Sequence, residues 1–222
     1  MHDFSLVAPL SLDLPEELSA ARERRIAGRF DDRLAGLDEA GRGPWAGPVV
    51  TAAVILDYSR LPAGLDDSKK LTEKKRQSLF EVICETADVS VAYASPRRID
   101  LMNIRAASLW AMCRAADGLR QHPAACLIDG RDIPPGLRYP GQAAIRGDGR
   151  ILAIAAASIV AKVVRDRLME RLDLLSPGYG FASHKGYGTP EHSEALARLG
   201  PCLHHRMSFR PVALASQTIG PN

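Results

Sequence analysis

Residues 36–49 read GLDEAGRGPWAGPV, in which two adjacent carboxylates end an apolar run and glycines follow directly. The apolar run predicts a strand, and the Gly-Arg-Gly-Pro segment predicts the turn that ends it. Because neighbouring residues on a strand point to opposite faces, we expect Asp38 and Glu39 to lie on different sides of the sheet. An Asp-Glu pair by itself is most simply a solvated turn, so the rest of the chain has to decide its role.

Strand-like and helical segments alternate on the C-terminal side of this turn. A strand-like run at 48–56 predicts a hairpin with the first strand. The following segments are 71–86 (helix), 89–94 (strand), 104–119 (helix), 124–128 (strand) and 151–175 (helix). Interleaved elements of this kind predict an α/β fold, with a mixed sheet that is flanked by helices.

The chain divides into three parts by composition. Residues 1–33 are predicted to be an N-terminal arm with an arginine-bearing helix that opens at 14–17, and residues 34–178 form the α/β core. Residues 179–222 are rich in Gly, His and Pro and predict a small C-terminal extension. We expect one short helix in it, at 190–199, and a loose tail at 213–222.

Bulk composition limits the possible classes of function. A hydrophobic content of 46% is typical of a soluble globular protein, and a net charge of +3 is too small to indicate a nucleic-acid partner without local clusters. The four cysteines form no C-x-x-C pair, which argues against structural zinc or a disulfide framework and favours a reducing compartment. No signal peptide or long apolar run is evident, so we expect a cytoplasmic protein with no membrane association.

Two further carboxylates stand where α/β proteins gather ligands. Asp129 ends the strand-like run at 124–128, and Asp148 lies in a glycine-rich turn before the longest helix. Strand ends and helix starts commonly meet at one site, so these two are expected to converge with the Asp-Glu pair. Taken singly, Asp148 could be a helix-entry residue and Asp129 a turn residue, with Asp132 as the ligand instead.

Convergent carboxylates need cations, and hard oxygen ligands select Mg²⁺ or Mn²⁺. Two such ions could activate a water and stabilise the leaving oxygen of a phosphodiester. Other chemistries have less support: there is no G-x-S-x-G elbow, and Cys202 near His204 is better explained as an ordinary thiol. The G-x-G-x-x-x-G spacing, followed by a strand, does not fit a dinucleotide-binding fingerprint.

Three segments carry candidate contacts to a phosphorylated substrate. The glycines after the Asp-Glu pair let the backbone approach a ligand, and the arginine between them suits phosphate. A Ser-Lys pair at an expected helix start also suits phosphate, while a Tyr between glycines could stack on a sugar or base. Solvated lysines and a Tyr packed under its own turn are the structural alternatives. The candidates are Gly41, Arg42, Gly43, Ser68, Lys69, Lys185 and Tyr187.

Four segments together resemble the signature segments of bacterial ribonuclease HII. They are DEAGRGP at 38–44, DSKKL at 67–71, AASIVAK at 156–162 and HKGYGT at 184–189. They occur in the family's order and, with HRMSF at 205–209, cover nearly all of residues 34–212. The resemblance implies an RNase H-like sheet with a helical C-terminal extension.

The same resemblance implies an endonuclease that cuts the RNA strand of RNA–DNA hybrids and cuts 5′ of a single ribonucleotide in duplex DNA. Its products would carry 3′-hydroxyl and 5′-phosphate ends. Carried over by position, Asp38, Glu39, Asp129 and Asp148 resemble the metal-binding catalytic carboxylates. Likewise, the glycine-flanked Arg42 and Tyr187 resemble the groups that recognise the ribonucleotide and its junction with DNA. No obligate protein partner is implied.

Two other classes of function remain at this stage. One is a nucleic-acid-binding module that has lost its chemistry, which the complete carboxylate set argues against. The other is a metal-dependent enzyme for a small phosphorylated substrate. Basic residues are spread from Arg42 through Lys69 to Lys185, which favours a long substrate.

Overall fold

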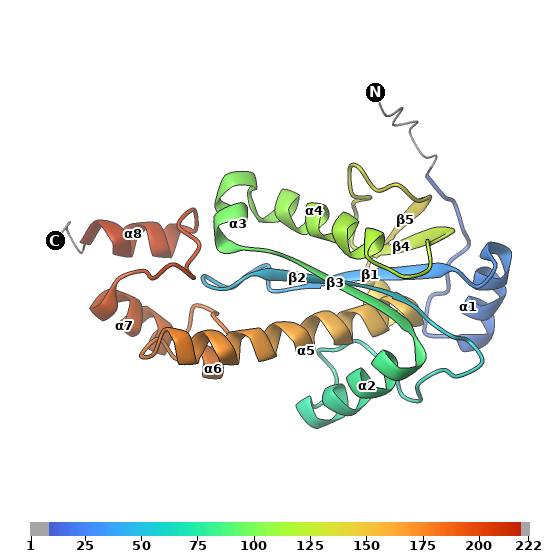
Figure 1. Ribbon diagram of the computed structural model, residues 1–222, viewed down its shortest axis with the longest axis horizontal. Coiled ribbons are helices and arrows are strands. Elements are labelled where there is room, and N and C mark those ends of the chain that lie inside the picture. The colour runs from blue at the N-terminus through green and yellow to red at the C-terminus, as the bar shows by residue number, and fades with distance from the viewer. Residues whose placement is uncertain (1–8, 219–222) are drawn as a thin grey trace.

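A five-stranded mixed sheet forms the centre of the computed structural model, which describes residues 9–218 (Figure 1). The strands are β1 (Leu34–Ala40), β2 (Val49–Ile55), β3 (Asp88–Ala94), β4 (Ala125–Asp129) and β5 (Gly141–Ala144), in the order β3-β2-β1-β4-β5. β2 pairs antiparallel with both β1 and β3, whereas β4 runs parallel to β1 and β5 parallel to β4. The predicted α/β class, mixed sheet and opening hairpin are confirmed.

Helices cover both faces of this sheet. They are α1 (Ala20–Ala27), α2 (Glu73–Thr86), α3 (Pro96–Met102), α4 (Ile104–Asp117), α5 (Leu152–Leu175), α6 (Phe181–His184), α7 (Pro190–Leu199) and α8 (Arg210–Thr218), with short 3-10 turns at Gly28–Phe30 (η1) and Gly147–Gly149 (η2). α5 and α2 lie on one face and α4 on the other (Figure 1). Burial on both faces explains why β2, VVTAAVI, is apolar at every position but Thr51 instead of alternating.

Close packing of α5 on β1 brings polar side chains of the helix to the sheet. Small residues fill the first turns of α5, and Gly36 lies directly opposite them. A Cβ on Gly36 would lie 2.1 Å from the main chain of Ala153, so no other residue fits there without displacing the helix. This approach places Ser158, about one and a half turns beyond Ala153 along α5, beside Asp38 at the end of β1.

The N-terminal residues pack against the same core. Leu12, Ile26 and Ala27 are buried in the hydrophobic cluster that α5 shares with the sheet. Glu23 of α1 is fully buried, and its carboxylate accepts the N–H groups of Leu152 and Ala153 at the start of α5. α5 has no side-chain cap of its own, so Glu23 takes that place.

Several elements differ from the sequence-based expectations. The first helix begins at Ala20, after its N-cap Ser19, and not near Leu14. The short elements β5, α3 and α6 have no periodic signal long enough to predict. The expected loose tail is wrong for residues 213–218, which belong to α8, because that helix buries Val212. Residues 219–222 lie outside the described part.

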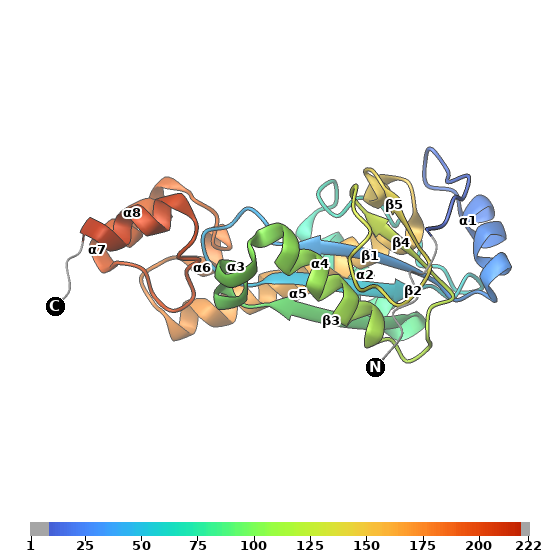
Figure 2. The same cartoon turned by 90° about the horizontal axis from the view of Figure 1, so that it is seen from above.

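The C-terminal helices gather at one end of the molecule. Figure 2 shows α7 and α8 together, at the opposite end from α1. The expected helix at 190–199 is confirmed as α7. Within residues 9–218, no helix combines the length and the apolarity that are needed to cross a membrane.

Candidate active site

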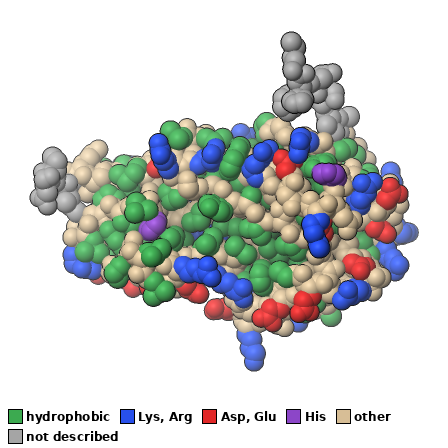
Figure 3. Space-filling view, viewed as in Figure 1, with side chains coloured by type: hydrophobic (Ala, Val, Ile, Leu, Met, Phe, Trp, Pro, Cys, Tyr) green, Lys and Arg blue, Asp and Glu red, His purple; other side chains and the backbone are tan. Residues whose placement is uncertain are grey.

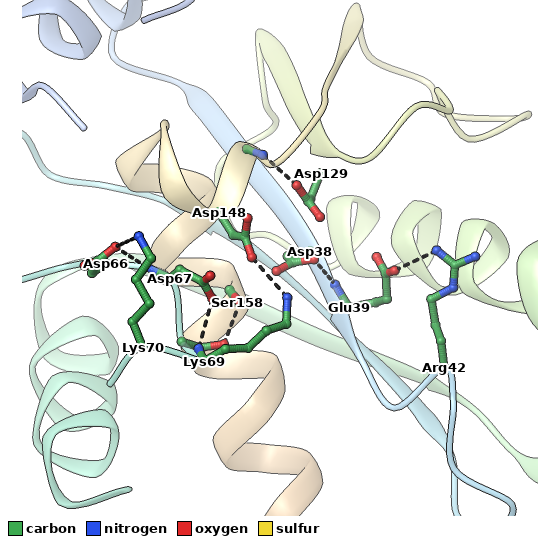
Figure 4. Close-up of polar contacts among 12 residues, drawn as sticks. Asp38, Glu39, Arg42, Asp66, Asp67, Lys69, Lys70, Asp129, Asp148 and Ser158 are labelled. Atoms are coloured by element: carbon green, nitrogen blue, oxygen red, sulfur yellow. Dashed lines mark hydrogen bonds and ion pairs between the residues drawn. The ribbon is translucent and has the colours of Figure 1, made fainter. Parts of the chain in front are cut away.

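Three carboxylates converge where β1 and β4 end. The parallel register pairs Leu37 with Ile128, so Asp38 and Asp129 follow side by side at the edge of the sheet. Asp148 reaches them from η2, the turn before α5. One oxygen from each of the three lies within 4.8 Å of the others, and Figure 4 shows them facing one another. The convergence that the sequence predicted is therefore present.

Glu39 lies beside this group but approaches from the other face of β1. Its carboxylate accepts a hydrogen bond from the guanidinium of Arg42 at 3.1 Å. Ser108 and Met112 of α4 line the same small cavity as Glu39 and Asp129. Asp38 and Glu39 thus point to opposite sides of the strand, as expected, and Glu39 borders the three converging carboxylates.

The structure brings Asp129, and not Asp132, to the carboxylate group. Asp132 is half-buried and accepts two hydrogen bonds from the guanidinium of Arg105, at 2.6 and 2.9 Å. Asp129 instead accepts the main-chain N–H of Gly147 at 2.7 Å, which ties β4 to the turn that carries Asp148. The sequence left this choice open because both residues follow the same strand.

Burial and mutual repulsion define the electrostatics of the site. Burial raises the pKa of Asp38 well above its usual value, and the neighbouring carboxylates of Glu39 and Asp129 raise it further. Burial, followed by the charge of Asp148, also raises the pKa of Asp129. A cation placed among these groups would stabilise their ionised forms.

The donor set fits a divalent metal ion. Three carboxylates that face one another supply the hard oxygen ligands that Mg²⁺ and Mn²⁺ prefer, and the pKa values of Asp38 and Asp129 are raised. The ammonium of Lys69 lies 3.3 Å from the carboxylate of Asp148. Burial alone would lower the pKa of Lys69, but the negative charge of Asp148 raises it overall. The protonated form of Lys69 is therefore stabilised beside the carboxylates.

A cleft of about 310 Å³ adjoins the carboxylates and unites most of the predicted substrate contacts. Its lining includes six of them: Gly41, Arg42, Gly43, Ser68, Lys69 and Tyr187. The seventh, Lys185, is not part of the lining. Its ammonium binds the carboxylate of Glu170 and the carbonyl of Ala182, both at 2.7 Å.

Ser68 occupies a different setting from the expected helix start. It lies in a turn, and α2 begins only at Glu73. The Ser68 hydroxyl is buried and shares a hydrogen bond of 2.8 Å with the hydroxyl of Ser158. The helix prediction was wrong at this end because Thr72, and not Ser68, caps α2. The pair nevertheless forms part of the cleft wall.

Two buried arginines, whose roles the sequence did not reveal, hold the glycine-rich loop. Arg206 donates to the carbonyls of Gly41, Arg42 and Gly47. Gly41 has a φ of +96°, and a Cβ there would collide with the guanidinium of Arg165. Arg165 in turn donates to Pro48, Ala46 and Lys185 carbonyls. Except for the bond from Arg165 to Lys185, these contacts join residues more than a hundred positions apart, so no local pattern could have revealed them.

A second hollow, of about 680 Å³, extends from the carboxylates past Asp148. Lys69, Lys70, Arg146 and Arg150 contribute basic side chains to it. On the face shown in Figure 3, basic and acidic side chains are interspersed around a hydrophobic centre, without a single large basic patch. Positive charge suited to phosphate is thus concentrated locally, beside the carboxylates.

Comparison with known proteins agrees with this geometry. Residues 35–212 match the family model described as Ribonuclease HII. The chain belongs to the ribonuclease HII family. The ribonuclease HII of Azorhizobium caulinodans is 60% identical over 195 residues, which cover 88% of this chain and 75% of that protein. That of Bradyrhizobium diazoefficiens is 58% identical over 201 residues, covering 90% and 77%.

Solved structures show the same ribonuclease HII architecture. The ribonuclease H2 of Pyrococcus horikoshii matches with a TM-score of 0.71 at 26% identity, covering 83% of this chain and 97% of that one. The ribonuclease HII of Archaeoglobus fulgidus, solved in a complex with PCNA, matches with a TM-score of 0.69 at 30% identity, covering 80% and 95%. Membership of the ribonuclease HII family makes this protein a metal-dependent endoribonuclease.

Proposed function

We propose that this protein cuts the RNA strand of RNA–DNA hybrids and also cuts 5′ of a single ribonucleotide embedded in duplex DNA, leaving 3′-hydroxyl and 5′-phosphate ends. Activity on hybrids follows from its family. The observation that carries the proposed site is the convergence of Asp38, Asp129 and Asp148 within 4.8 Å, with Glu39 beside them. We assign these four as the catalytic carboxylates, Mg²⁺ or Mn²⁺ as the metal, and the cytoplasm as the compartment.

The carboxylates have defined tasks in this proposal. Asp38, Asp129 and Asp148 would hold the divalent cations, and Glu39 would complete the ligand set from the other face of β1. A bound divalent cation supplies an activated water and stabilises the negative charge of the phosphodiester as it is cut. Lys69, beside Asp148, lies where it can bind a non-bridging phosphate oxygen.

Recognition of the ribonucleotide is assigned to the cleft. Gly43 carries no side chain that would keep a ribose away, and the absence of one at Gly41 makes room for Arg165 behind the loop. The main chain of both residues can therefore approach the 2′-hydroxyl, the group that distinguishes RNA from DNA. The ring of Tyr187 is 47% exposed and lies 3.6 Å from the position of a Cβ on Gly43, where it can stack at the junction with DNA. Base edges need not be read, so cutting should be independent of sequence.

The three-part organisation remains our proposal for the chain. Residues 34–178 would form the catalytic core, and residues 179–222 would supply Tyr187. The arm at 1–33 supports the core through Glu23, whose carboxylate caps α5 close to Asp148. Lys185 would act from outside the cleft, since its ammonium is engaged by Glu170.

One assay tests the proposed function. The protein is incubated with Mg²⁺ or Mn²⁺ and a labelled DNA duplex that contains one ribonucleotide, beside an all-DNA duplex of the same sequence and a long RNA–DNA hybrid. We expect cutting 5′ of the ribonucleotide, cutting of the hybrid, and no cutting of the all-DNA duplex. Cutting of the hybrid alone would contradict the single-ribonucleotide activity.

A further inference from the structure

Three buried histidines stack beneath the turn that carries Tyr187, and the proposed chemistry uses none of them. The rings of His184 and His192 lie 4.5 Å apart and nearly parallel, and His205 lies 5.2 Å from His192. All three are at most 9% exposed. The stack joins α6, α7 and the segment before α8.

Hydrogen bonds fix the protonation of two of these rings. Nδ1 of His192 lies 2.9 Å from the carbonyl oxygen of Tyr187, which can only accept, so Nδ1 carries a proton. In a neutral imidazole Nε2 must then accept, and it lies 3.0 Å from Nε2 of His205. His205 therefore donates through Nε2 and accepts the N–H of Cys202 at its Nδ1, 3.0 Å away. The relay runs in one direction, from the Cys202 N–H to the Tyr187 carbonyl.

The relay connects to the glycine-rich loop through Trp45. The indole ring lies 5.4 Å from the ring of His192, and a Cβ on Gly188 would lie 2.1 Å from an indole carbon. The main-chain N–H of Trp45 donates to the carbonyl of Gly186 at 2.8 Å. His192 thus lies between the turn that carries Tyr187 and the loop that carries Gly41 and Gly43.

We propose that His192, oriented by His205, is a positioning residue that fixes the main chain at Tyr187 and so sets the selectivity for a single embedded ribonucleotide. This inference rests on the proposed function, because it needs Tyr187 to act at the RNA–DNA junction. A single ribonucleotide offers one binding register, so it depends on a fixed Tyr187. A long hybrid offers many registers and tolerates a looser turn.

Two substitutions of His192 distinguish a positioning role from simple packing. The positioning role needs an N–H donor at the place of Nδ1, whereas packing needs only a ring. In His192→Phe an aromatic ring still fills the space between Trp45 and Phe181, but the carbonyl of Tyr187 loses its side-chain donor and keeps only the main-chain N–H of Thr189. In His192→Asn the side-chain amide can place an N–H near the position of Nδ1, although the ring is lost. A packing role therefore favours the Phe variant, and a positioning role favours the Asn variant.

The experiment compares kcat/KM for a duplex with one ribonucleotide and for a long RNA–DNA hybrid. Wild type, His192→Phe, His192→Asn and the control His122→Phe are measured, His122 being an exposed histidine that contacts Tyr139. We expect the ratio of the two values to fall about tenfold in His192→Phe, which removes both the donor to the Tyr187 carbonyl and the acceptor for His205. It should recover to within about threefold in His192→Asn and stay unchanged in the control.

The outcomes are separable. If wild type leaves the single ribonucleotide uncut, the proposed function fails. If wild type cuts it and His192→Phe keeps the ratio, or His192→Asn lowers it further than His192→Phe, the positioning role is overturned. Should His192→Phe not fold, long-range ¹H–¹⁵N NMR on wild type decides the matter. A proton on Nδ1 of His192 and on Nε2 of His205 supports the relay, and the opposite tautomers overturn it.

Discussion

The carboxylate group at the end of β1 and the histidine stack under Tyr187 are both buried and polar, yet they differ in the partners that their polar atoms face. In the stack, each hydrogen bond of the relay pairs a donor with an acceptor, and burial lowers the pKa of His192 and of His205, which favours their neutral rings. In the carboxylate group, like charges face one another, and the pKa values of Asp38 and Asp129 are raised as a result of burial and repulsion. The first arrangement is complete without a ligand, whereas the second needs a cation.

This difference distinguishes residues that stabilise the fold from residues that the reaction uses. A complementary network stabilises the native state and specifies a geometry, as the relay does for Tyr187. A group of unneutralised carboxylates destabilises the metal-free protein and is retained because the reaction uses it. Substitutions in the two regions should therefore have opposite effects on stability.

The largest effect is expected for Asp38→Asn. Removing one charge at nearly constant shape should lower the rate of cutting at least roughly a hundredfold, about 3 kcal/mol of transition-state stabilisation. The same change removes a repelled buried charge, so the melting temperature of the metal-free protein should rise. Single-turnover kinetics measure the rate of cutting, and thermal unfolding measures the melting temperature. The control is Asp132→Asn, outside the carboxylate group, which should neither lower the rate nor raise the melting temperature. Near-normal cutting by folded Asp38→Asn would refute the assignment.

Tyr187→Ala tests recognition apart from chemistry. Losing the stacked ring should remove roughly 1–3 kcal/mol of substrate interaction and leave the metal site unchanged. The loss in kcat/KM should be greater for the single ribonucleotide than for a long hybrid, because only the latter offers many registers. An equal loss on both substrates would make Tyr187 a structural residue of its turn.

Glu23 is a buried carboxylate like Asp38, but both of its oxygens accept hydrogen bonds and none of the converging carboxylates faces it. It accepts the N–H groups of Leu152 and Ala153 and the hydroxyl of Tyr58. Unlike Asp38→Asn, Glu23→Ala should therefore lower the stability, by about 1–2 kcal/mol, the usual cost of losing a helix cap. Urea unfolding measures this, with Glu17→Ala on the exposed surface of the arm as the control. A gain in stability would show that burial of charge matters more here than its hydrogen bonds.

A pH dependence of stability is expected for the histidine stack. Burial, and then the neighbouring imidazole of His192, lower the pKa of His205 from 6.5 to about 4. Between these values the unfolded chain binds more protons than the folded one, so stability is greatest above pH 6.5 and falls as the pH approaches 4. Thermal unfolding of wild type and His205→Asn across this range should show a shallower decline in the variant. Parallel declines would mean that His205 does not contribute.

Local patterns were sufficient for the central elements. The hairpin around 36–49 and the long helices carry strong periodic or turn signals, and the register of the parallel strands then places Asp38 beside Asp129. β5 and α6 have only four residues each, which is too short for a periodic signal. The helix at 210–218 forms because tertiary packing covers Val212, which the sequence does not reveal.

The limits of sequence reasoning at the site have the same physical origin. The guanidinium of Arg206 donates hydrogen bonds to main-chain carbonyls of the loop at Gly41, about 160 residues away in the sequence. Hydrogen bonds between such distant residues leave no local sequence pattern. Lys185 belongs to the same signature segment as Tyr187, but its ammonium binds the carboxylate of Glu170. Residue type predicted which groups suit phosphate, and only the fold shows which of them reach the cleft.

The central claim is that the carboxylate group is built to hold a divalent cation, and a calorimetric titration of Mn²⁺ into the metal-free protein tests it most directly. Wild type should bind Mn²⁺ saturably, with a matching rise in melting temperature, because the cation relieves the repulsion among Asp38, Asp129 and Asp148. Asp38→Asn should lose most of both effects, and Asp132→Asn should keep them. Equal binding and equal stabilisation in wild type and Asp38→Asn would contradict the account.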